Sequence, residues 1–523
     1  MSGALESPSI APGAHRGWTR WAAPALVVVL TITAFLPAIH NEFLNWDDAQ
    51  NYLDNPHYRG LGPRQLAWML TTFHMGHYIP ATWITFGLDY LLWGVSPAGY
   101  HLTNILFHAA TALAFYFVCL RLLRTALPES LETDLRIGAA LAALLFAIHP
   151  LRAESVAWVT ERRDVVSGLF YILSVTAYLK AVDGVDRVRP QWYWTSIGLF
   201  ACGLLSKSIV VSLPVVLLAL DVYPLKRLGG ERGWLRWHVW LEKVPYLLLG
   251  AAAAVIGFFA LFTIGNTRSL AAMGPLYRTV LSIYGLAFYL WKSVMPFGLS
   301  PLYQLDFTVT WLHFGVVAVM LGIALLMRRR WPAFTVATVV YVATLLPVLG
   351  VFQNGPQAAA DRYTYLACLG WAVILGGFAA RPWPGRNVTR VVLSICVLAM
   401  LPLTWQQVGV WRDSVTLWSH AIALSPYSRA GHFNLAGAHE GAGRYAAAVA
   451  EYEQVARLSG RFKGRWYITI GWNYEKAKVD RLALAAFRTA LGIEPGLSDA
   501  CEGITRVAKR LGVAPGPRPG CRE

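Results

Sequence analysis

Long apolar segments separated by short basic clusters dominate this chain and constrain its fold more than any other feature. A helix needs about 20 apolar residues to cross the hydrocarbon core of a bilayer. Only 14% of the 523 residues are charged, compared with about a quarter in a soluble domain. The sequence therefore predicts an all-α polytopic membrane protein with about eleven transmembrane helices. The candidate segments are 21–39, 101–123, 136–150, 165–181, 192–206, 208–223, 244–264, 308–327, 331–352, 363–380 and 389–406.

The basic clusters predict the orientation of these segments, because lysine and arginine accumulate in the cytoplasmic loops of membrane proteins. The arrangement requires segment 277–296 to be a re-entrant or interfacial helix that does not cross. It places the N-terminus in the cytoplasm, and the first large loop and the C-terminal part on the outer face of a bacterial inner membrane. The clusters expected in the cytoplasm are Arg121 with Arg124, Arg187 with Arg189, the run from Lys226 to His238, Arg328–Arg330, and Arg381 with Arg386 and Arg390.

The net charge of +16 is of the kind found in proteins that bind nucleic acids. In this chain, however, the basic residues lie between apolar segments, where membrane topology and lipid phosphates account for them. We therefore expect membrane lipids as partners and no nucleic acid.

A repeat of about 35 residues begins after Trp411, where the apolar pattern changes from continuous to amphipathic. Small and aromatic residues recur at the positions where the helices of tetratricopeptide repeats touch. An unrelated pair of helical hairpins is the alternative. The matching positions are Leu435, Ala436, Ala448, Tyr452 and Ala456 in one unit, and Ile470, Gly471, Ala483, Phe487 and Leu491 in the next.

The sequence thus predicts a cytoplasmic segment 1–20, a transmembrane domain 21–408, a helical repeat array 409–510 and a flexible tail 511–523. The repeats are few, so we expect the array to pack against the membrane domain, which would then cap one end of the array. A disulfide between Cys501 and Cys521 is an alternative for the tail.

Polar residues collect at the predicted outer ends of the apolar segments. Asp47 and Asp48 directly follow the first segment, where charge is costly to hold near hydrocarbon. Basic residues return to the same face, and a lipid phosphate would be a suitable anionic partner for them. A solvated loop, and ion pairs that only fix topology, are the alternatives for each motif taken singly. The residues concerned are Asn55, His149, Arg152, Glu154, Arg163, Asp164, Lys207, Asp361, Arg362 and Tyr363.

His101, Asn104 and His108 fall on one face of a helix and raise the question of a metal site. Asparagine is a poor zinc ligand, and two histidines without a third strong donor are commonly packing residues. We therefore expect no metal among the site residues and no required cofactor, with a divalent metal as the alternative.

Taken together, these motifs resemble the transmembrane and tetratricopeptide-repeat (TMTC) family, whose members have a GT-C membrane glycosyltransferase fold. The resemblance covers roughly residues 22–495 and includes the repeats. Two departures weaken the transfer of donor specificity: Ser208 stands where members often have an acidic residue, and Ile79 precedes Pro80 where many have arginine. The motifs that carry the resemblance are Asp47-Asp48, Asp54-Asn55-Pro56, His101 with Asn104 and His108, His149-Pro150 with Glu154, Arg163-Asp164, Leu205-Ser206-Lys207 and Asp361-Arg362-Tyr363.

The resemblance implies transfer of a hexose, mannose in eukaryotic members, from a polyprenyl-phosphate carrier to a protein hydroxyl. It also implies that Asp47 or Asp48 supplies the catalytic carboxylate, and we favour Asp47. Such a donor brings its own leaving group, so the enzyme needs a base for the acceptor hydroxyl and cations for the departing phosphate. Arg163, Lys207 and Arg362 are the phosphate candidates, with Arg152 behind them. A single displacement at the anomeric carbon would invert its configuration.

Two other functions remain open at this point. The acceptor is a protein if the repeats present a peptide-binding face, and a lipid or an envelope glycan otherwise. A membrane-anchored repeat scaffold without activity is the non-enzymatic alternative, although an anchor alone needs only one span.

Overall fold

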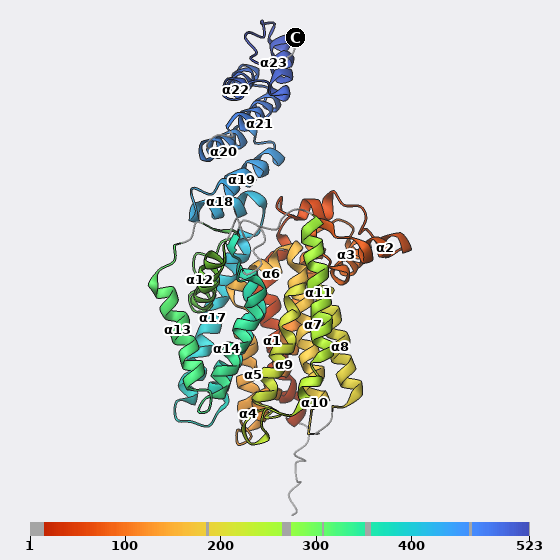
Figure 1. Ribbon diagram of the computed structural model, residues 1–523, viewed down its shortest axis with the longest axis vertical. Helices are drawn as coiled ribbons and strands as arrows, with labels where there is room; N and C mark the ends of the chain where they lie inside the picture. Colours follow the sequence, from red (N-terminus) through yellow and green to blue (C-terminus); the bar gives the residue numbers. More distant parts are fainter. Residues whose placement is uncertain are drawn as a thin grey trace, which may run out of the picture.

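The computed structural model describes residues 15–184, 188–263, 274–305, 308–350, 357–459 and 463–521. It confirms the prediction of an all-α membrane protein, since a bundle of long apolar helices carries an array of shorter helices at one end (Figure 1). In the described ranges, the strands are limited to one short antiparallel pair, β1 (Tyr303–Gln304) and β2 (Gln357–Ala359).

Longer helices form the bundle, and most of them run lengthwise between its two ends (Figure 1). They are α1 (His15–Phe35), α4 (Pro97–Ala126), α5 (Glu132–Ala147), α7 (Arg162–Ala181), α8 (Pro190–Leu204), α9 (Leu213–Val222), α11 (Val244–Thr263), α12 (Pro275–Val294), α13 (Trp311–Leu326), α14 (Pro332–Leu345), α16 (Leu369–Ala380) and α17 (Arg386–Val410). Short elements connect them: η1 (Leu36–His40), η2 (Ala49–Leu53), α2 (Pro63–Thr71), η3 (His74–Gly76), α3 (Pro80–Trp93), η4 (Pro150–Arg152), α6 (Ala153–Ala157), η5 (Val159–Glu161), η6 (Ser208–Ser212), η7 (Gly230–Arg232), α10 (Trp237–Leu241), η8 (Leu346–Val348), η9 (Asp361–Tyr363) and α15 (Thr364–Ala367).

Within the described residues, five helical segments are long and apolar enough to cross a membrane: Arg20–His40, Pro97–Ala126, Val159–Ala181, Trp237–Phe262 and Arg386–Val410. Two bent pairs, Glu132–Ala147 with Pro150–Ala157 and Asp361–Ala367 with Leu369–Ala380, raise the number to seven if each is one span. Shorter apolar helices account for other predicted spans, so the number of eleven crossings stays a prediction.

Helix α12 covers most of the segment predicted as re-entrant or interfacial. It is 20 residues long but is not among the candidate spans. Its apolar side packs in one cluster with residues of α13 and α14, and the Tyr341 hydroxyl of α14 donates a hydrogen bond to the Leu286 carbonyl of α12. Whether α12 crosses the bilayer stays a prediction.

Helices α5 and α16 approach one another closely because glycines face each other at their contact. A Cβ atom added at Gly376 would collide with the carbonyl oxygen of Gly138, and a Cβ added at Gly138 would collide with that of Gly376. Small residues allow helix backbones to come together in membranes, where dispersion contacts drive association. This contact draws α16 into the core, and the polar residues of η9 precede it in the chain.

The helical array begins directly after α17. It comprises α18 (Ser414–Leu424), α19 (Arg429–Gly441), α20 (Tyr445–Leu458), α21 (Lys463–Lys476), α22 (Asp480–Ile493) and α23 (Ser498–Leu511). The repeated positions of the sequence are buried in both units, including Tyr452 and its counterpart Phe487. The Phe487 ring occupies the space left by Gly471 on one side and Gly503 on the other, which explains why small and aromatic residues recur there.

The sequence predicts a flexible tail over residues 511–523. In the structure, residues 512–521 fold back on the end of the array. The Gly496 N–H donates to the Pro519 carbonyl at 3.0 Å, and a disulfide joins Cys501 to Cys521.

The array and the first large loop lie at the same end of the bundle, and α10 lies at the other end (Figure 1). The predicted cytoplasmic residues Arg386 and Arg390, at the start of α17, both pair with Asp134 near the start of α5, away from the array. The fold therefore places Arg386 and Arg390 at the end of the bundle away from the loop that contains Asp47.

The contact between α5 and α16 predicts opposite effects for two identical substitutions. Gly376→Ala should lower the stability of the protein by about 1–3 kcal/mol, because the methyl group has no room. Gly198→Ala on α8, where an added Cβ meets no atom within 4 Å, should be neutral or stabilising by up to about 1 kcal/mol. Thermal unfolding of both variants in detergent tests this, and equal shifts in the two would contradict it.

Candidate active site

The two adjacent aspartates of the first loop point to different surroundings. Asp48 is fully buried, and its carboxylate accepts hydrogen bonds from the N–H groups of Leu44 (3.0 Å) and Thr160 (3.1 Å). The Thr160 hydroxyl accepts from the Asn51 amide and donates to Asp48 at 2.6 Å. Asp48 therefore connects the first loop to the turn before α7, and its role is structural.

Asp47 faces a small cavity that is also lined by Arg163, His77 and Thr160. No described residue forms a hydrogen bond or an ion pair with its carboxylate. Burial raises the pKa of Asp47, and the positive charges of Arg163 and Arg362 offset part of that rise. Asp47 is thus a half-buried carboxylate that lines a cavity and has no bonding partner among the described residues, which suits a general base.

Burial also lowers the pKa of His77 to about 3, and the charge of Arg163 acts in the same direction. The imidazole beside Asp47 is therefore neutral near pH 7 and can accept or donate a hydrogen bond without adding charge. The turn that carries it includes Met75, whose φ of 49° lies in the left-handed region and which lines the same cavity.

A single buried carboxylate, that of Glu161, joins three of the predicted phosphate-binding cations. Arg163 donates to it through Nε and Nη2 at 3.1 and 2.5 Å, Lys207 Nζ lies 2.7 Å away, and Arg362 Nε lies 3.3 Å away. Glu161 is fully inaccessible to solvent. We call Glu161, Arg163, Lys207 and Arg362 the cation cluster. It unites the segments that contain residues 161, 207 and 362.

Two further carboxylates balance the charge of the cation cluster. Asp164 accepts from Lys207 Nζ at 2.6 Å and from the Ser155 hydroxyl at 3.0 Å. Glu154 pairs with the Arg362 guanidinium and accepts the Arg362 backbone N–H at 2.8 Å. Buried charges need such partners because desolvation is costly.

The arginines of the cation cluster retain unused donors. Among the described residues, Nη1 of Arg163 and Nη2 of Arg362 have no hydrogen-bond partner, although the other guanidinium nitrogens hold both side chains in place. Both residues are less than one-tenth exposed. Preorganised cations with free N–H groups are suited to binding an anion such as phosphate.

Three other predicted residues lie beside the cation cluster without joining it. Arg152 is buried against the rings of Phe146 and Tyr365 and donates to the Thr364 hydroxyl. Asp361 accepts from the Tyr303 hydroxyl at 2.9 Å, and the Tyr363 hydroxyl accepts from Gln357. Arg152 therefore pairs with no carboxylate in the described part of the chain, and its role in phosphate binding stays a prediction.

Asn104 holds the turn that presents Glu161 and Arg163. Its amide donates to the carbonyls of Val156 and Trp158, and its oxygen accepts from Arg162 Nε at 2.7 Å. Arg162 is completely buried and pairs with Asp89 of α3. Of the adjacent arginines, Arg162 thus fastens the first loop to α7, and Arg163 faces the cavity.

The remaining predicted residues have local bonding roles. The His149 ring bonds to the Leu151 N–H and the Ser293 carbonyl, and Asn55 accepts the His57 N–H in a tight turn. His101 is buried beside the backbone of Asn41 and Glu42. His108 is engaged on both nitrogens, by Tyr365 and by the Ala147 carbonyl. The described residues contain no group of three or more potential metal ligands.

Sequence reasoning did not select Glu161, Thr160 or His77, although all three surround Asp47 or the cation cluster. Glu161 had a detectable signal, since it directly precedes two arginines at the outer end of an apolar segment. Thr160 had none, because only the fold brings it to the first loop, and His77 lies in the same loop as Asp47 but 30 residues further along the chain, so that only the fold places the two side chains on one cavity.

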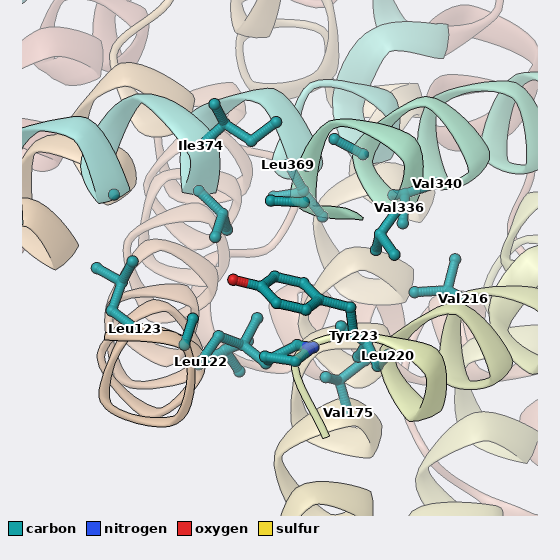
Figure 2. A pocket seen from close by; sticks show the side chains of 18 of the residues that line it. Leu122, Leu123, Val175, Val216, Leu220, Tyr223, Val336, Val340, Leu369 and Ile374 are labelled. Carbon is teal, nitrogen blue, oxygen red and sulfur yellow. The ribbon is translucent and has the colours of Figure 1, made fainter. Parts of the chain in front are cut away.

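An apolar cavity of about 230 Å³ lies lower in the bundle, between α4, α7, α9, α14 and α16 (Figure 2). Its lining includes Leu122, Val216 and Val340, and Arg381 is its one charged residue among those described. We call this cavity the apolar groove. Its upper part includes Tyr171, which lies two turns below Asp164 on the same face of α7, or about 10 Å along the axis.

The buried position of Asp48 predicts a specific pH dependence of stability. Burial raises the pKa of Asp48 from 3.8 to about 7, against the opposing effect of its hydrogen bonds. Between about pH 4 and 7 the folded protein therefore binds more protons at Asp48 than the unfolded chain, so stability is lost as the pH rises. Asp48→Asn should remove this loss, which is on the order of 4 kcal/mol at most.

Thermal unfolding of wild type and Asp48→Asn across this range is the measurement. The unfolding temperature of the wild type should fall more steeply than that of the variant, and parallel curves would contradict the assignment.

No family model matches the chain. It is similar to curated protein O-mannosyl-transferases: one from Caenorhabditis elegans (23% identical, 78% of this chain and 59% of the relative), Tmtc3 from Drosophila melanogaster (24%, 80% and 52%) and TMTC1 from Homo sapiens (22%, 84% and 55%). The chain spans about half the length of these relatives. Over most of its own length, the chain is a TMTC-like protein.

Proposed function

We propose that this chain is a membrane glycosyltransferase of the GT-C type that moves a hexose, such as mannose, from a polyprenyl-phosphate carrier to a hydroxyl group of a protein. The observation that carries the proposal is that Asp47 and Arg163 line one cavity, with Arg163 bound into the cation cluster. The names of the similar proteins support a protein as the acceptor.

The chemistry follows from the charges around this cavity. Asp47 accepts the proton of the acceptor hydroxyl while the oxygen attacks the anomeric carbon of the sugar. The bond from that carbon to the phosphate oxygen breaks, and the leaving phosphate carries the electron pair. The free guanidinium donors of Arg163 and Arg362 and the charge of Lys207 stabilise that phosphate. One such displacement inverts the anomeric centre.

The apolar groove suits the isoprenoid tail of the carrier. Asp164, which fixes Lys207, and Tyr171, which lines the groove, share one face of α7. A phosphate at the cation cluster would therefore direct its tail down this face. An isoprenoid chain has no polar atoms to satisfy, and the lining offers almost none.

The orientation of the protein is part of the proposal. The active-site loop and the array lie at one end of the bundle (Figure 1), and we assign that end to the outer face. The disulfide between Cys501 and Cys521 supports this assignment, because disulfides persist in oxidising compartments.

Asp47→Asn should reduce sugar transfer by about 10²–10⁴-fold, because the variant cannot accept a proton from the acceptor. Purified protein is incubated with a panel of polyprenyl-phosphate sugars and a peptide acceptor, and the product is quantified. Glu42→Gln is the matched control, since Glu42 is exposed on the same loop and should retain full activity. A fully active Asp47→Asn would exclude Asp47 as the base, and wild type inactive with every donor would favour the scaffold.

Val336→Trp, which fills the apolar groove from α14, should raise the KM for a long-tailed donor by at least about tenfold, since buried methylene groups contribute much of its affinity. The KM for a donor whose tail is too short to enter the groove should not change. Leu398→Trp on the exposed side of α17 is the control. The same increase in KM for both donors would show that the tail binds elsewhere.

A further inference from the structure

Asn45, two residues before Asp47, is bound to the helical array through three hydrogen bonds. Its backbone N–H donates to the Ser414 hydroxyl at 2.9 Å. Its side-chain oxygen accepts the Trp418 indole N–H at 2.9 Å, and its amide nitrogen donates to the Asn434 carbonyl at 2.9 Å. These partners lie on α18 and α19, so one loop residue satisfies its polar groups almost entirely with the array.

Trp46, the next residue, continues the contact through its ring. It stacks on Trp158 with centroids 4.7 Å apart and an interplanar angle of 15°, and it contacts Trp418 of α18 at 5.0 Å. Trp158 in turn stacks on Trp411, at the junction between α17 and the array. The array therefore contacts the loop through the ring of Trp46 as well as through the polar groups of Asn45.

The same aromatic stack reaches the cation cluster. The Arg362 guanidinium lies 5.7 Å from the Trp158 ring. Trp158 directly precedes η5, which ends at Glu161, and its carbonyl accepts the Glu161 N–H at 3.1 Å. Trp46 thus contacts Trp158, which in turn contacts both Glu161 and Arg362 of the cation cluster.

Few bonds other than those to the array fix the loop just before Asp47. The Glu42 N–H donates to the Arg412 carbonyl at 2.8 Å, and Leu44 is held by Asp48. The side chain of Asp47 itself has no partner among the described residues. Its direction toward the cavity is therefore set by the backbone on either side: Asp48 fixes the C-terminal side, and Asn45 and Trp46 fix the N-terminal side.

We infer that Asn45 and Trp46 are positioning residues, through which the first two helices of the array hold Asp47 in place for catalysis. The inference rests on the proposed function for its catalytic part. It assigns the array a role in the reaction with every acceptor, in addition to any contact with a protein substrate. A positioned base depends on such support, because a misplacement of about 1 Å can cost 10²-fold in rate.

Hydrogen–deuterium exchange of the full-length protein in lipid nanodiscs tests the positioning directly. Asn45→Ala removes both side-chain bonds to the array, and Trp418→Phe removes one of them while keeping a ring against Trp46. Trp418→Phe should accelerate exchange in residues 42–48 by about 5- to 10-fold and Asn45→Ala by more, because each lost hydrogen bond is worth roughly one such factor. Tyr452→Phe is the control, since it removes a hydrogen bond to Glu440 inside the array.

Transfer kinetics provide the second measurement. In Asn45→Ala and Trp418→Phe, kcat should fall by at least about tenfold with both a peptide and a small alcohol as acceptor, while the KM for the donor is unchanged. A small alcohol is too short to reach the array from the cavity. A fall in kcat with this acceptor therefore reports on the position of Asp47 alone.

Three outcomes would overturn the inference. Unchanged exchange in residues 42–48 in both variants would show that the array does not order the loop, whatever the activity. A rise in the KM for the peptide alone would mean that these contacts serve acceptor binding. Faster exchange with unchanged kcat would show that the ordering has no catalytic effect. Wild-type protein without transferase activity would refute the proposed function, while the exchange measurement would still decide the structural part.

Discussion

The end of the bundle that carries the array is organised around one buried carboxylate. Glu161 binds Arg163, Lys207 and Arg362, and each of these cations comes from a different part of the chain. Isolated charges are too costly to bury, so the segments can pack only if they bring their charges together. Glu154 and Asp164 complete the balance. This requirement fixes the start of α7, the turn after α8 and the entry to α15 relative to one another, and the loop containing Asp47 then packs upon them.

Two pairs of adjacent residues with the same charge, Asp47 with Asp48 and Arg162 with Arg163, each contain one buried anchor and one residue that lines the cavity. Asp48 and Arg162 are fully buried and bonded on every side, whereas Asp47 and Arg163 face the cavity. Consecutive residues project in different directions, so one member of each pair can anchor the backbone while its neighbour faces the cavity. The anchored residue gives the other a fixed position without a bond to its functional atoms. This arrangement leaves the Asp47 oxygens and a guanidinium nitrogen of Arg163 available for a substrate.

The apolar groove and the array extend the candidate site in opposite directions. The groove continues below the cation cluster along the face of α7 that contains Asp164 and Tyr171. The array lies above it and reaches the loop through Asn45 and Trp46. A donor with a charged head and an apolar tail suits the lower half, and a macromolecular acceptor suits the upper half. The reacting groups would meet at Asp47, where the two halves join.

The sequence by itself determined the all-α membrane character, the helical repeats and the set of residues that converge at one end, because hydropathy, repeat spacing and charge are local properties of the chain. It selected Arg163, Lys207 and Arg362 but not Glu161, which links them, and it favoured Asp47 over Asp48 as the base without showing that Asp48 has a structural role. The tertiary structure decided those points. Asp47 lines the cavity while Asp48 bonds to Thr160, and Arg162 pairs with Asp89 while Arg163 pairs with Glu161. These differences depend on segments that are distant in the sequence. The same reason explains Asn45, whose partners Ser414, Trp418 and Asn434 are brought to it only by the packing of the array on the bundle.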